Sequence, residues 1–372
     1  MFNRAIRQSF LTFLQTVFLL AAGCGLNEGG SGELHGRVQS ALTGVGVQGA
    51  AVIIPGVGTG THSDLTTITD GNGNYEFMEI PEGRFTVNAS AQGYFQSSYN
   101  SVRVYNAQST TRNFTLFPLD GPQGKLSGKI TSALTGDPQE GISVTVLGLG
   151  LTGVSGQSGS YFLENIPIGV HSIQAHANTY DAVTSDNISI FEDFTTEVNF
   201  VVSPSLTAGN GIMRFVLTWG EFPSDLDSHL KTAEIGEQGY HVYYADRGDS
   251  TVAPYTWLDV DDVTSWGPET MTVYRAFSGT YYYYIHNYSR SRSSDDAGIA
   301  ELYESHATVQ IYDRSGLRET IPVPESGNGI YWNVCEINMV RGTIEIINVV
   351  QEDAPGWNEN STDMVEWVKG ER

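Results

Sequence analysis

The sequence predicts an all-β protein made of two small antiparallel β-sandwiches followed by a larger β-sandwich. Three observations predict this class. A block of short strands occurs twice, the strands alternate apolar with polar residues, and glycine, proline and asparagine separate them at short intervals. The 372 residues are too many for one ordinary β domain and fit two or three.

Residues 1–23 have the pattern of a secretory signal peptide. Arg4 and Arg7 give a basic start, and residues 10–22 form an apolar run that is too short to span a membrane. The small residues of A-A-G-C then end the run at Cys24.

The position of Cys24 directly after Ala22-Gly23 resembles the lipobox of bacterial lipoproteins, although Ala21 stands where leucine is usual. This resemblance implies that the Cys24 thiol takes a diacylglycerol and anchors the chain to a membrane in the bacterial cell envelope. Gly25 after the cysteine favours the outer membrane. The alternative is an ordinary cleaved signal peptide that leaves a free cysteine.

Cys24 and Cys335 are the only cysteines, so a disulfide framework is excluded. Cys335 lies in an apolar strand pattern, which predicts a small buried residue and not a nucleophile.

The formal net charge is −23, and the chain has no lysine or arginine cluster. This balance argues against a nucleic-acid partner and suits either a cation partner or simple solubility. The acidity is concentrated in residues 211–372, which hold 26 Asp/Glu against 11 Lys/Arg.

A glycine-rich tether over residues 24–32 precedes the repeated block. Residues 34–44 match residues 126–136, with S-A-L-T-G identical, and residues 74–83 match residues 160–169. The match predicts two copies of one fold, over residues 33–118 and 125–203.

The residues that repeat also carry a family resemblance. They are G-x-V/I in the first strand, then T-D-G-N-G-N-Y-E-F-M-E-I-P-E-G-R-F-T-V with A-Q-G-Y after it, and the looser S-G-S-Y-F-L-E-N-I-P-I-G in the second copy. This pattern resembles the carboxypeptidase regulatory-like domain. The resemblance implies a prealbumin-like or immunoglobulin-like sandwich and a carbohydrate-binding-like fold class.

Three motifs in the repeats are better explained by structure than by chemistry. The loop that begins at Asp70 starts like an EF-hand but has Tyr75 where glycine is required, so a hairpin turn is expected. The glycines of residues 148–153 are not followed by a helix, which excludes a dinucleotide site and predicts a β turn. His171 and His176 fall on opposite faces of one strand.

A linker that begins at Ser203 leads to residues 211–350, which predict a jelly-roll-like or immunoglobulin-like sandwich of eight or nine strands. The expected strands cover residues 213–219, 226–230, 239–244, 271–274, 281–288, 307–312, 317–321, 330–337 and 343–349.

Acidic residues of this third segment form a candidate calcium site. In an extended strand, Asp225, Asp227 and His229 face one way, while Leu226, Ser228 and Leu230 face the other. A segment expected to be rich in turns supplies more carboxylates, and calcium prefers oxygen ligands. The candidate ligands are Asp225, Asp227, Asp259, Asp261, Asp262 and Glu269. The alternative is a solvated acidic rim with aspartates that cap turns, and no other cofactor is suggested.

The tyrosines of residues 281–288 give two aromatic faces. One face belongs to the core, and the other is either a stacking surface for a ligand or ordinary cross-strand packing. The candidate ligand-binding residues are Tyr282, Tyr284, His286 and Tyr288.

The motifs L-T-W-x-x-x-P-S-D-L-D-S-H-L, L-D-V-D-D-x-x-x-x-G-P-E-T and G-T-Y-x-Y-x-I-H-N-Y resemble the YfaP-type domain of bacterial secreted proteins, whose function is unknown. The resemblance spans residues 211–350 and implies no activity. The polar tail over residues 351–372 has a possible short helix at residues 362–369.

Motif searches favour a protein that is not an enzyme, because H-x-x-E, H-E-x-x-H and G-x-S-x-G are absent. Two functions fit the sequence. One is a membrane-anchored structural spacer and interaction module, with an envelope protein as partner. The other is a surface protein that binds a glycan or peptide, with calcium as a possible stabiliser.

Overall fold

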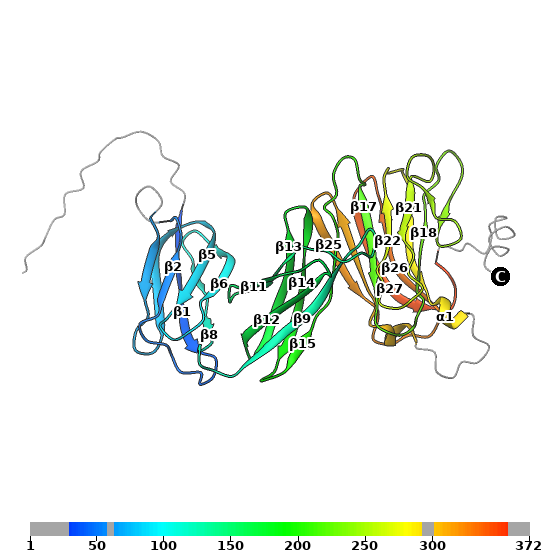
Figure 1. Cartoon of the computed structure of the whole chain (residues 1–372). Coiled ribbons are helices and arrows are strands. Elements are labelled where there is room, and N and C mark those ends of the chain that lie inside the picture. The colour runs from blue at the N-terminus through cyan, green and yellow to red at the C-terminus, as the bar shows by residue number, and fades with distance from the viewer. Residues whose placement is uncertain (1–29, 58–62, 292–300, 356–372) are drawn as a thin grey trace, which may run out of the picture.

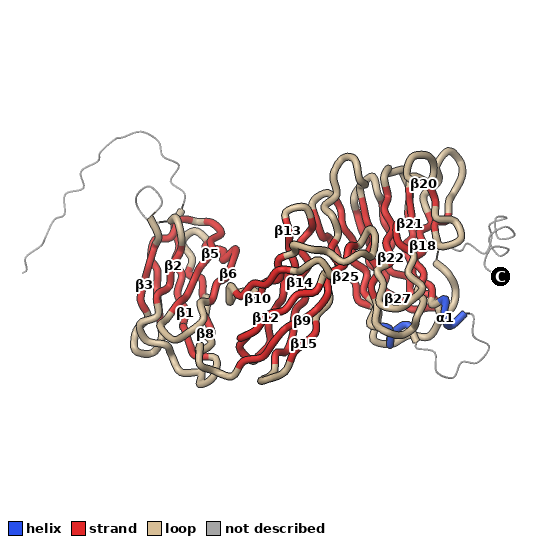
Figure 2. The backbone as a smooth tube through the Cα atoms, viewed as in Figure 1, coloured by secondary structure: helices blue, strands red, loops and turns tan. Residues whose placement is uncertain are grey.

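The computed structural model describes residues 30–57, 63–291 and 301–355. Almost every element in these ranges is a strand, and the strands form three units that follow one another in chain order (Figures 1 and 2). The predicted all-β class is therefore confirmed. None of the helices in the described ranges has the length and apolar character needed to span a membrane.

The first unit is a sandwich of two sheets. One sheet has the order β4-β1-β7, with β8 also paired to β1, and the other has the order β3-β2-β5-β6. Strand β1 pairs antiparallel with β4 but parallel with β7 and β8. The strands are β1 (Ser31–Ser40), β2 (Ala51–Ile54), β3 (Leu65–Ile68), β4 (Asn74–Pro81), β5 (Gly83–Ser90), β6 (Ser97–Val104), β7 (Ser109–Thr111) and β8 (Phe114–Leu116).

The second unit repeats this topology strand for strand. Its sheets are β12-β9-β15, with β16 also on β9, and β11-β10-β13-β14. The strands are β9 (Gln123–Ser132), β10 (Ser143–Val146), β11 (Leu151–Val154), β12 (Ser160–Pro167), β13 (Gly169–Ala177), β14 (Tyr180–Ile190), β15 (Thr195–Glu197) and β16 (Phe200–Val202).

The repeated glycine and tyrosine have one shared physical role. The Tyr75 hydroxyl donates to the Arg112 carbonyl at 2.6 Å, and a Cβ on Gly36 would lie 1.8 Å from that same oxygen. In the second unit, Tyr161 donates to the Val198 carbonyl at 2.5 Å beside Gly128. The glycine makes room for the carbonyl, and the buried tyrosine hydroxyl satisfies it.

The three motifs of the repeats form the local structures predicted for them. Asp70 accepts hydrogen bonds from the backbone amides of Asn72 and Asn74, which closes a turn. The glycine-rich residues 147–150 connect β10 to β11 as a hairpin. His171 is buried and His176 is exposed, on opposite faces of β13.

The third unit is a larger sandwich, with a six-stranded sheet β20-β21-β22-β17-β24-β25 and a five-stranded sheet β19-β18-β23-β26-β27. Its strands are β17 (Met213–Thr218), β18 (Asp227–Lys231), β19 (His241–Val242), β20 (Gly248–Asp249), β21 (Thr256–Val260), β22 (Glu269–Val273), β23 (Tyr281–His286), β24 (Thr308–Asp313), β25 (Gly316–Pro322), β26 (Tyr331–Asn338) and β27 (Thr343–Gln351). Its short helices are α1 (Tyr288–Ser291) and the 3-10 turn Leu302–Ser305.

Two strands of this unit, β20 and β21, were not predicted, so its described residues hold eleven strands where eight or nine were expected. The segment expected to be rich in turns begins with β21, which pairs with β22 and buries Thr256 and Leu258. The prediction also extended the tyrosine strand to residue 288, whereas β23 ends at His286 and α1 begins at Tyr288.

The core of the third unit lies between its two sheets. Phe215 of β17 stacks on Tyr283 of β23 with ring centroids 4.3 Å apart. Cys335 is fully buried in this core, and burial raises the pKa of its thiol. The prediction of a small buried residue at this position is confirmed.

The junction between the second and third units is hydrogen-bonded through a buried arginine. Arg214 of β17 donates from Nη1 to the Ser203 hydroxyl at 2.9 Å and to the Pro204 carbonyl at 2.7 Å. Its Nε donates to the Thr272 hydroxyl at 3.0 Å. A small apolar cluster spans the same junction and consists of Ala133, Leu206, Val216 and Tyr312. The linker is therefore held by both units.

Candidate functional site

The most unusual group of side chains in the molecule lies on the five-stranded sheet of the third unit. Asp227 and His229 alternate along β18 with Ser228 and Leu230, as the sequence predicted. Leu230 joins the core, whereas Asp227 and His229 lie on the opposite face of the sheet. That face is covered, because Asp227 is only 2% exposed and His229 only 1%. The alternative of a solvated acidic rim is therefore wrong for Asp227.

Register places a second histidine beside this pair. Asp227 pairs with His286 across β18 and β23, and His229 pairs with Tyr284. His286 Nδ1 lies 3.7 Å from Asp227 Oδ2, and the His286 side chain is 12% exposed. The pairing of β18 with β23 thus brings one carboxylate and two imidazoles together.

Stacked aromatic rings cover the histidines. The His229 ring lies 4.8 Å from that of Tyr284 and 5.0 Å from that of His241. Tyr331 stacks on His286 at 4.7 Å. Tyr284 and Tyr331 form a small apolar cluster with Ala354, at the C-terminal end of the described chain. These rings keep water away from the polar atoms beneath them.

Hydrogen bonds fix the orientation of His229. Its Nδ1 lies 2.8 Å from His241 Nε2, which also lies 3.1 Å from the Tyr284 hydroxyl. Burial lowers the pKa of His229 well below its usual value and the pKa of His241 to about 3. Both imidazoles are therefore neutral near pH 7.

Two more carboxylates approach Asp227 from the other sheet and its adjoining loop. Glu269 of β22 accepts a hydrogen bond from the Ser228 amide, and it is 1% exposed. Burial, with Asp227 nearby, raises its pKa well above the usual value. Burial also raises the pKa of Asp227, and the interaction with His286 opposes that change.

These side chains form two sets of possible metal ligands that share Asp227. The first set is Asp227, His229 and His286, and the second is Asp227, Asp261 and Glu269. In each set, one ligand atom per residue lies within 4.8 Å of the others. We call the five residues together the Asp227 cluster.

Three predicted calcium ligands lie outside both sets. Asp262 accepts hydrogen bonds from Thr264 and so caps its own turn. Asp259 accepts from the Thr272 hydroxyl at 2.6 Å, on the side of the sheet that faces Arg214. Burial raises the pKa of Asp259 to about 6. Asp225 precedes β18, and its backbone amide donates to the Ser289 hydroxyl at 3.0 Å, while its carbonyl accepts from the Ser289 amide at 3.3 Å.

The predicted aromatic ligand surface is only partly accessible. Tyr284 is fully buried, so its ring serves cross-strand packing and not ligand stacking. Tyr282, His286 and Tyr288 are only partly accessible. Of these four residues, His286 alone belongs to the Asp227 cluster.

The sequence profile of the family described as carboxypeptidase regulatory-like domain matches residues 33–117 and 125–203. The first two units are carboxypeptidase regulatory-like domains. Their shared strand order and their repeated glycine and tyrosine agree with this assignment.

Solved structures give weaker similarities. A cohesin–X-dockerin complex of Acetivibrio cellulolyticus is 15% identical over 23% of this chain and 60% of that chain, with a TM-score of 0.21. The shaft pilin SpaA of Lactobacillus rhamnosus GG is 10% identical over 48% of this chain and 99% of its own, with a TM-score of 0.20. The minor pilin GBS52 of Streptococcus agalactiae is 10% identical over 48% and 98%, with a TM-score of 0.21. At these values the similarities carry no functional conclusion.

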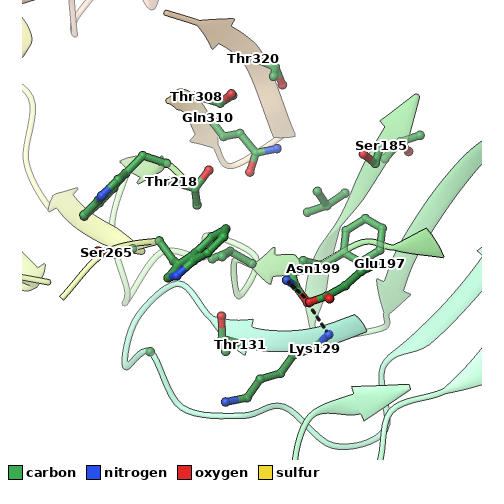
Figure 3. A pocket seen from close by; sticks show the side chains of 18 of the residues that line it. Lys129, Thr131, Ser185, Glu197, Asn199, Thr218, Ser265, Thr308, Gln310 and Thr320 are labelled. Carbon is green, nitrogen blue, oxygen red and sulfur yellow. Dashed lines mark hydrogen bonds between the residues drawn. The ribbon is translucent and has the colours of Figure 1, made fainter. Parts of the chain in front are cut away.

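A groove lies between the second regulatory-like domain and the third unit. This groove has a volume of about 920 Å³ and is lined by polar side chains from both (Figure 3). On one wall the Asn199 amide donates to Glu197 at 3.1 Å, and its carbonyl oxygen accepts from the Lys129 backbone amide at 2.7 Å. On the other wall Trp266 is 57% exposed.

Sequence reasoning missed His241 and the grouping of the histidines. From the sequence, His229 was placed beside the candidate calcium ligands and His286 among the candidate ligand-binding residues. His241 was not singled out. Strand register decides which of them meet, and that register is not visible in one sequence. The alternation of His241 with Tyr243 was the available sign, because it places both rings on one face of a strand.

Proposed function

We propose that this protein is a lipid-anchored, non-catalytic protein of the bacterial cell envelope, in which two regulatory-like domains act as spacers for a YfaP-like interaction domain. The observation that carries the proposal is the arrangement of the units. They stand in a row, with the first described residues in the unit at one end and the third unit at the other (Figure 1). An anchor at the N-terminus would therefore place the third unit farthest from the membrane.

The contacts at the two junctions support a spacer. Between the first two units, the Ser98 amide donates to the Gly148 carbonyl at 3.1 Å, and the rings of Phe117 and His171 lie 5.3 Å apart. Between the second and third units, Arg214 and its partners hold the linker. Hydrogen-bonded junctions oppose the free rotation that a flexible linker would allow.

The anchor rests on Cys24 and the residues before it, which lie outside the described residues. A diacylglycerol on this cysteine supplies enough apolar surface to hold a protein at a bilayer. The absence of H-x-x-E, H-E-x-x-H and G-x-S-x-G from the sequence supports a role without catalysis.

The anchor is tested by expressing the full chain and its Cys24→Ser variant in a bacterium fed with labelled palmitate. We expect the unchanged protein to incorporate label and to enter the detergent phase of a Triton X-114 separation. Cys24→Ser should incorporate none and stay in the aqueous phase, while Cys335→Ser serves as the matched control and behaves like the unchanged protein. Equal partitioning of the Cys24→Ser variant and the unchanged protein would rule out the anchor.

A glycan-binding role is a second candidate, and the groove between the second and third units favours it. Its exposed Trp266 offers a surface for stacking on a sugar ring, and Glu197, Asn199 and Gln310 offer hydrogen-bond partners nearby. Glycan-array binding that is lost in Trp266→Ala but kept in Trp257→Ala would support this role. Trp257 is a suitable control because it is 37% exposed and lies outside the groove. No binding across a broad array removes the candidate.

A further inference from the structure

The Asp227 cluster contains buried polar atoms that the protein itself does not satisfy. His229 Nε2, His286 Nε2 and Asp227 Oδ2 are inaccessible to solvent and have no hydrogen-bond partner. The same holds for Asp261 Oδ1 and Glu269 Oε2 of the competing carboxylate set. Buried polar groups in folded proteins are nearly always paired, because an unpaired group loses its hydration without compensation. Five such atoms in one cluster point to a bound partner that completes their interactions.

Strand geometry places these side chains around one point. Asp227 and His229 lie two residues apart on the same face of β18, and His286 lies opposite Asp227 on β23. Zinc binds imidazole nitrogen and carboxylate oxygen at about 2.0–2.2 Å, so neighbouring ligands in a tetrahedral site lie roughly 3.5 Å apart. The ligand atoms here lie within 4.8 Å of one another. Small side-chain rotations would bring them to the spacing of a tetrahedral site.

The hydrogen bonds around His229 allow the required lone pair on Nε2. His241 Nε2 lies 2.8 Å from His229 Nδ1 and 3.1 Å from the Tyr284 hydroxyl. In the tautomer in which His229 donates from Nδ1 to His241, His229 Nε2 carries no proton, and this is the tautomer that a metal on Nε2 requires. A histidine that binds a metal through one nitrogen commonly donates a hydrogen bond from the other.

We propose that Asp227, His229 and His286 bind a divalent transition-metal ion of the zinc class. Imidazole is a good ligand for zinc and its neighbours in the first transition row, whereas calcium takes oxygen ligands almost exclusively. Three protein ligands leave a fourth position of a tetrahedral site to water or to a ligand from outside. The aromatic rings of Tyr284 and Tyr331 shield the site and hold the two imidazoles in place.

The carboxylate set Asp227, Asp261 and Glu269 is the competing site. It shares Asp227 but contains no imidazole, so it would select calcium or magnesium. The two sets therefore predict opposite responses to the loss of His286 and to the loss of Asp261. That difference makes the proposal testable with one variant in each set.

The test uses the full chain in detergent, stripped of metal with EDTA and titrated with Co²⁺ and then Zn²⁺. We expect one Co²⁺ per chain with visible d–d absorption, displacement by Zn²⁺, and a higher melting temperature for the zinc-loaded protein. His286→Gln should weaken Co²⁺ binding by at least about tenfold, since loss of a ligand costs at least as much as loss of its supporting partner. Asp261→Asn and the exposed control His176→Gln should bind like the unchanged protein.

Three outcomes would overturn the proposal. They are the absence of Co²⁺ and Zn²⁺ binding, unchanged affinity in His286→Gln, and stabilisation by calcium that Asp261→Asn abolishes while His286→Gln does not. X-ray absorption of the zinc-loaded, unsubstituted protein gives a test that does not depend on any variant folding. We expect the scattering of two imidazoles, and a shell of oxygen alone would exclude the site.

Discussion

The regulatory-like domains and the third unit treat buried polar groups in different ways. In the first domain, the buried Thr69 hydroxyl donates to the Val47 carbonyl at 2.6 Å and accepts from the Ala50 amide at 2.9 Å. Ser155 makes the equivalent pair of bonds in the second domain, with Gln139 and Ile142. In these domains buried polar atoms serve the fold.

In the third unit, the Asp227 cluster buries carboxylates and imidazoles with several atoms unpaired. This is not a general property of that unit, because Arg214 is equally buried and donates from Nε, Nη1 and Nη2. The contrast teaches that unpaired buried atoms gather in this cluster, whereas in the regulatory-like domains Arg112 Nε and Asp181 Oδ2 stand singly. A bound ion is one partner that would satisfy several such atoms at once.

The largest effect should come from the close backbone approach that both regulatory-like domains share. Gly36→Ala places a Cβ 1.8 Å from the Arg112 carbonyl oxygen, so β1 and the chain beside it must separate. We expect a loss of about 3–5 kcal/mol of stability in the first domain, measured by urea unfolding. Gly71→Ala is the control, because a Cβ there meets no atom within 4 Å. Equal stability of the two variants would show that the shared glycine is dispensable.

A smaller effect should follow from Arg214→Met at the second junction. The methionine keeps much of the apolar stem but removes the donors to Ser203, Pro204 and Thr272. We expect a loss of roughly 3 kcal/mol, because partners of a buried charge are left unpaired. Small-angle scattering should also show a wider range of interunit angles. Arg318→Ala, at a partly exposed pair with Asp313, should change neither measurement. An unchanged scattering profile in Arg214→Met would contradict a junction held by this residue.

The smallest effect concerns pH and His171, which faces Phe117 at the first junction. Burial lowers the pKa of His171 below its usual value, and its Nε2 donates to the Pro167 carbonyl at 2.8 Å. The unfolded chain therefore binds a proton more readily than the folded one. The pKa of histidine in the unfolded chain is near 6.5. The stability that depends on His171 is therefore fully present above that pH and decreases as the pH falls below it. We expect a decreasing melting temperature of the second domain below pH 6.5, and a weaker decrease in His171→Gln. Identical pH profiles would exclude His171 as the cause.

The sequence predicted the regulatory-like domains almost completely, because the information lies in local patterns. Turn glycines, alternating strands and an internal repeat can each be recognised without knowledge of the fold, and the turn at Asp70 formed as expected. The third unit was harder. Its β21 was taken for turns because Asp259, Asp261 and Asp262 dominate that stretch, although Trp257 and Leu258 pair in a sheet.

The candidate site was predicted in part for the same reason. Alternation along β18 correctly placed Asp227 and His229 on one face. His286 joins them because β18 pairs with β23 in a particular register. Tertiary packing decides both the pairing and the register, so one sequence does not reveal them.

Asp259 was grouped with Asp261 by proximity in sequence, yet it lies with Thr272 and Arg214. Residues two apart share a face of a regular strand, but β21 has a register shift between Leu258 and Val260 and ends at Val260. Proximity in sequence therefore does not bring Asp259 and Asp261 to one ligand.

Strand β1 pairs in parallel with β7 and β8, and β9 pairs in parallel with β15 and β16. These pairings allow the chain to change in length by whole domains. The first strand of each regulatory-like domain is paired on both sides by strands of its own domain. Within the described parts of the two domains, no strand crosses from one domain to the next to complete a sheet. A whole domain can therefore be added or removed by one duplication or deletion without opening a sheet edge in its neighbours. Each such duplication or deletion would change the distance between the N-terminal end of the first domain and the third unit by the length of one domain.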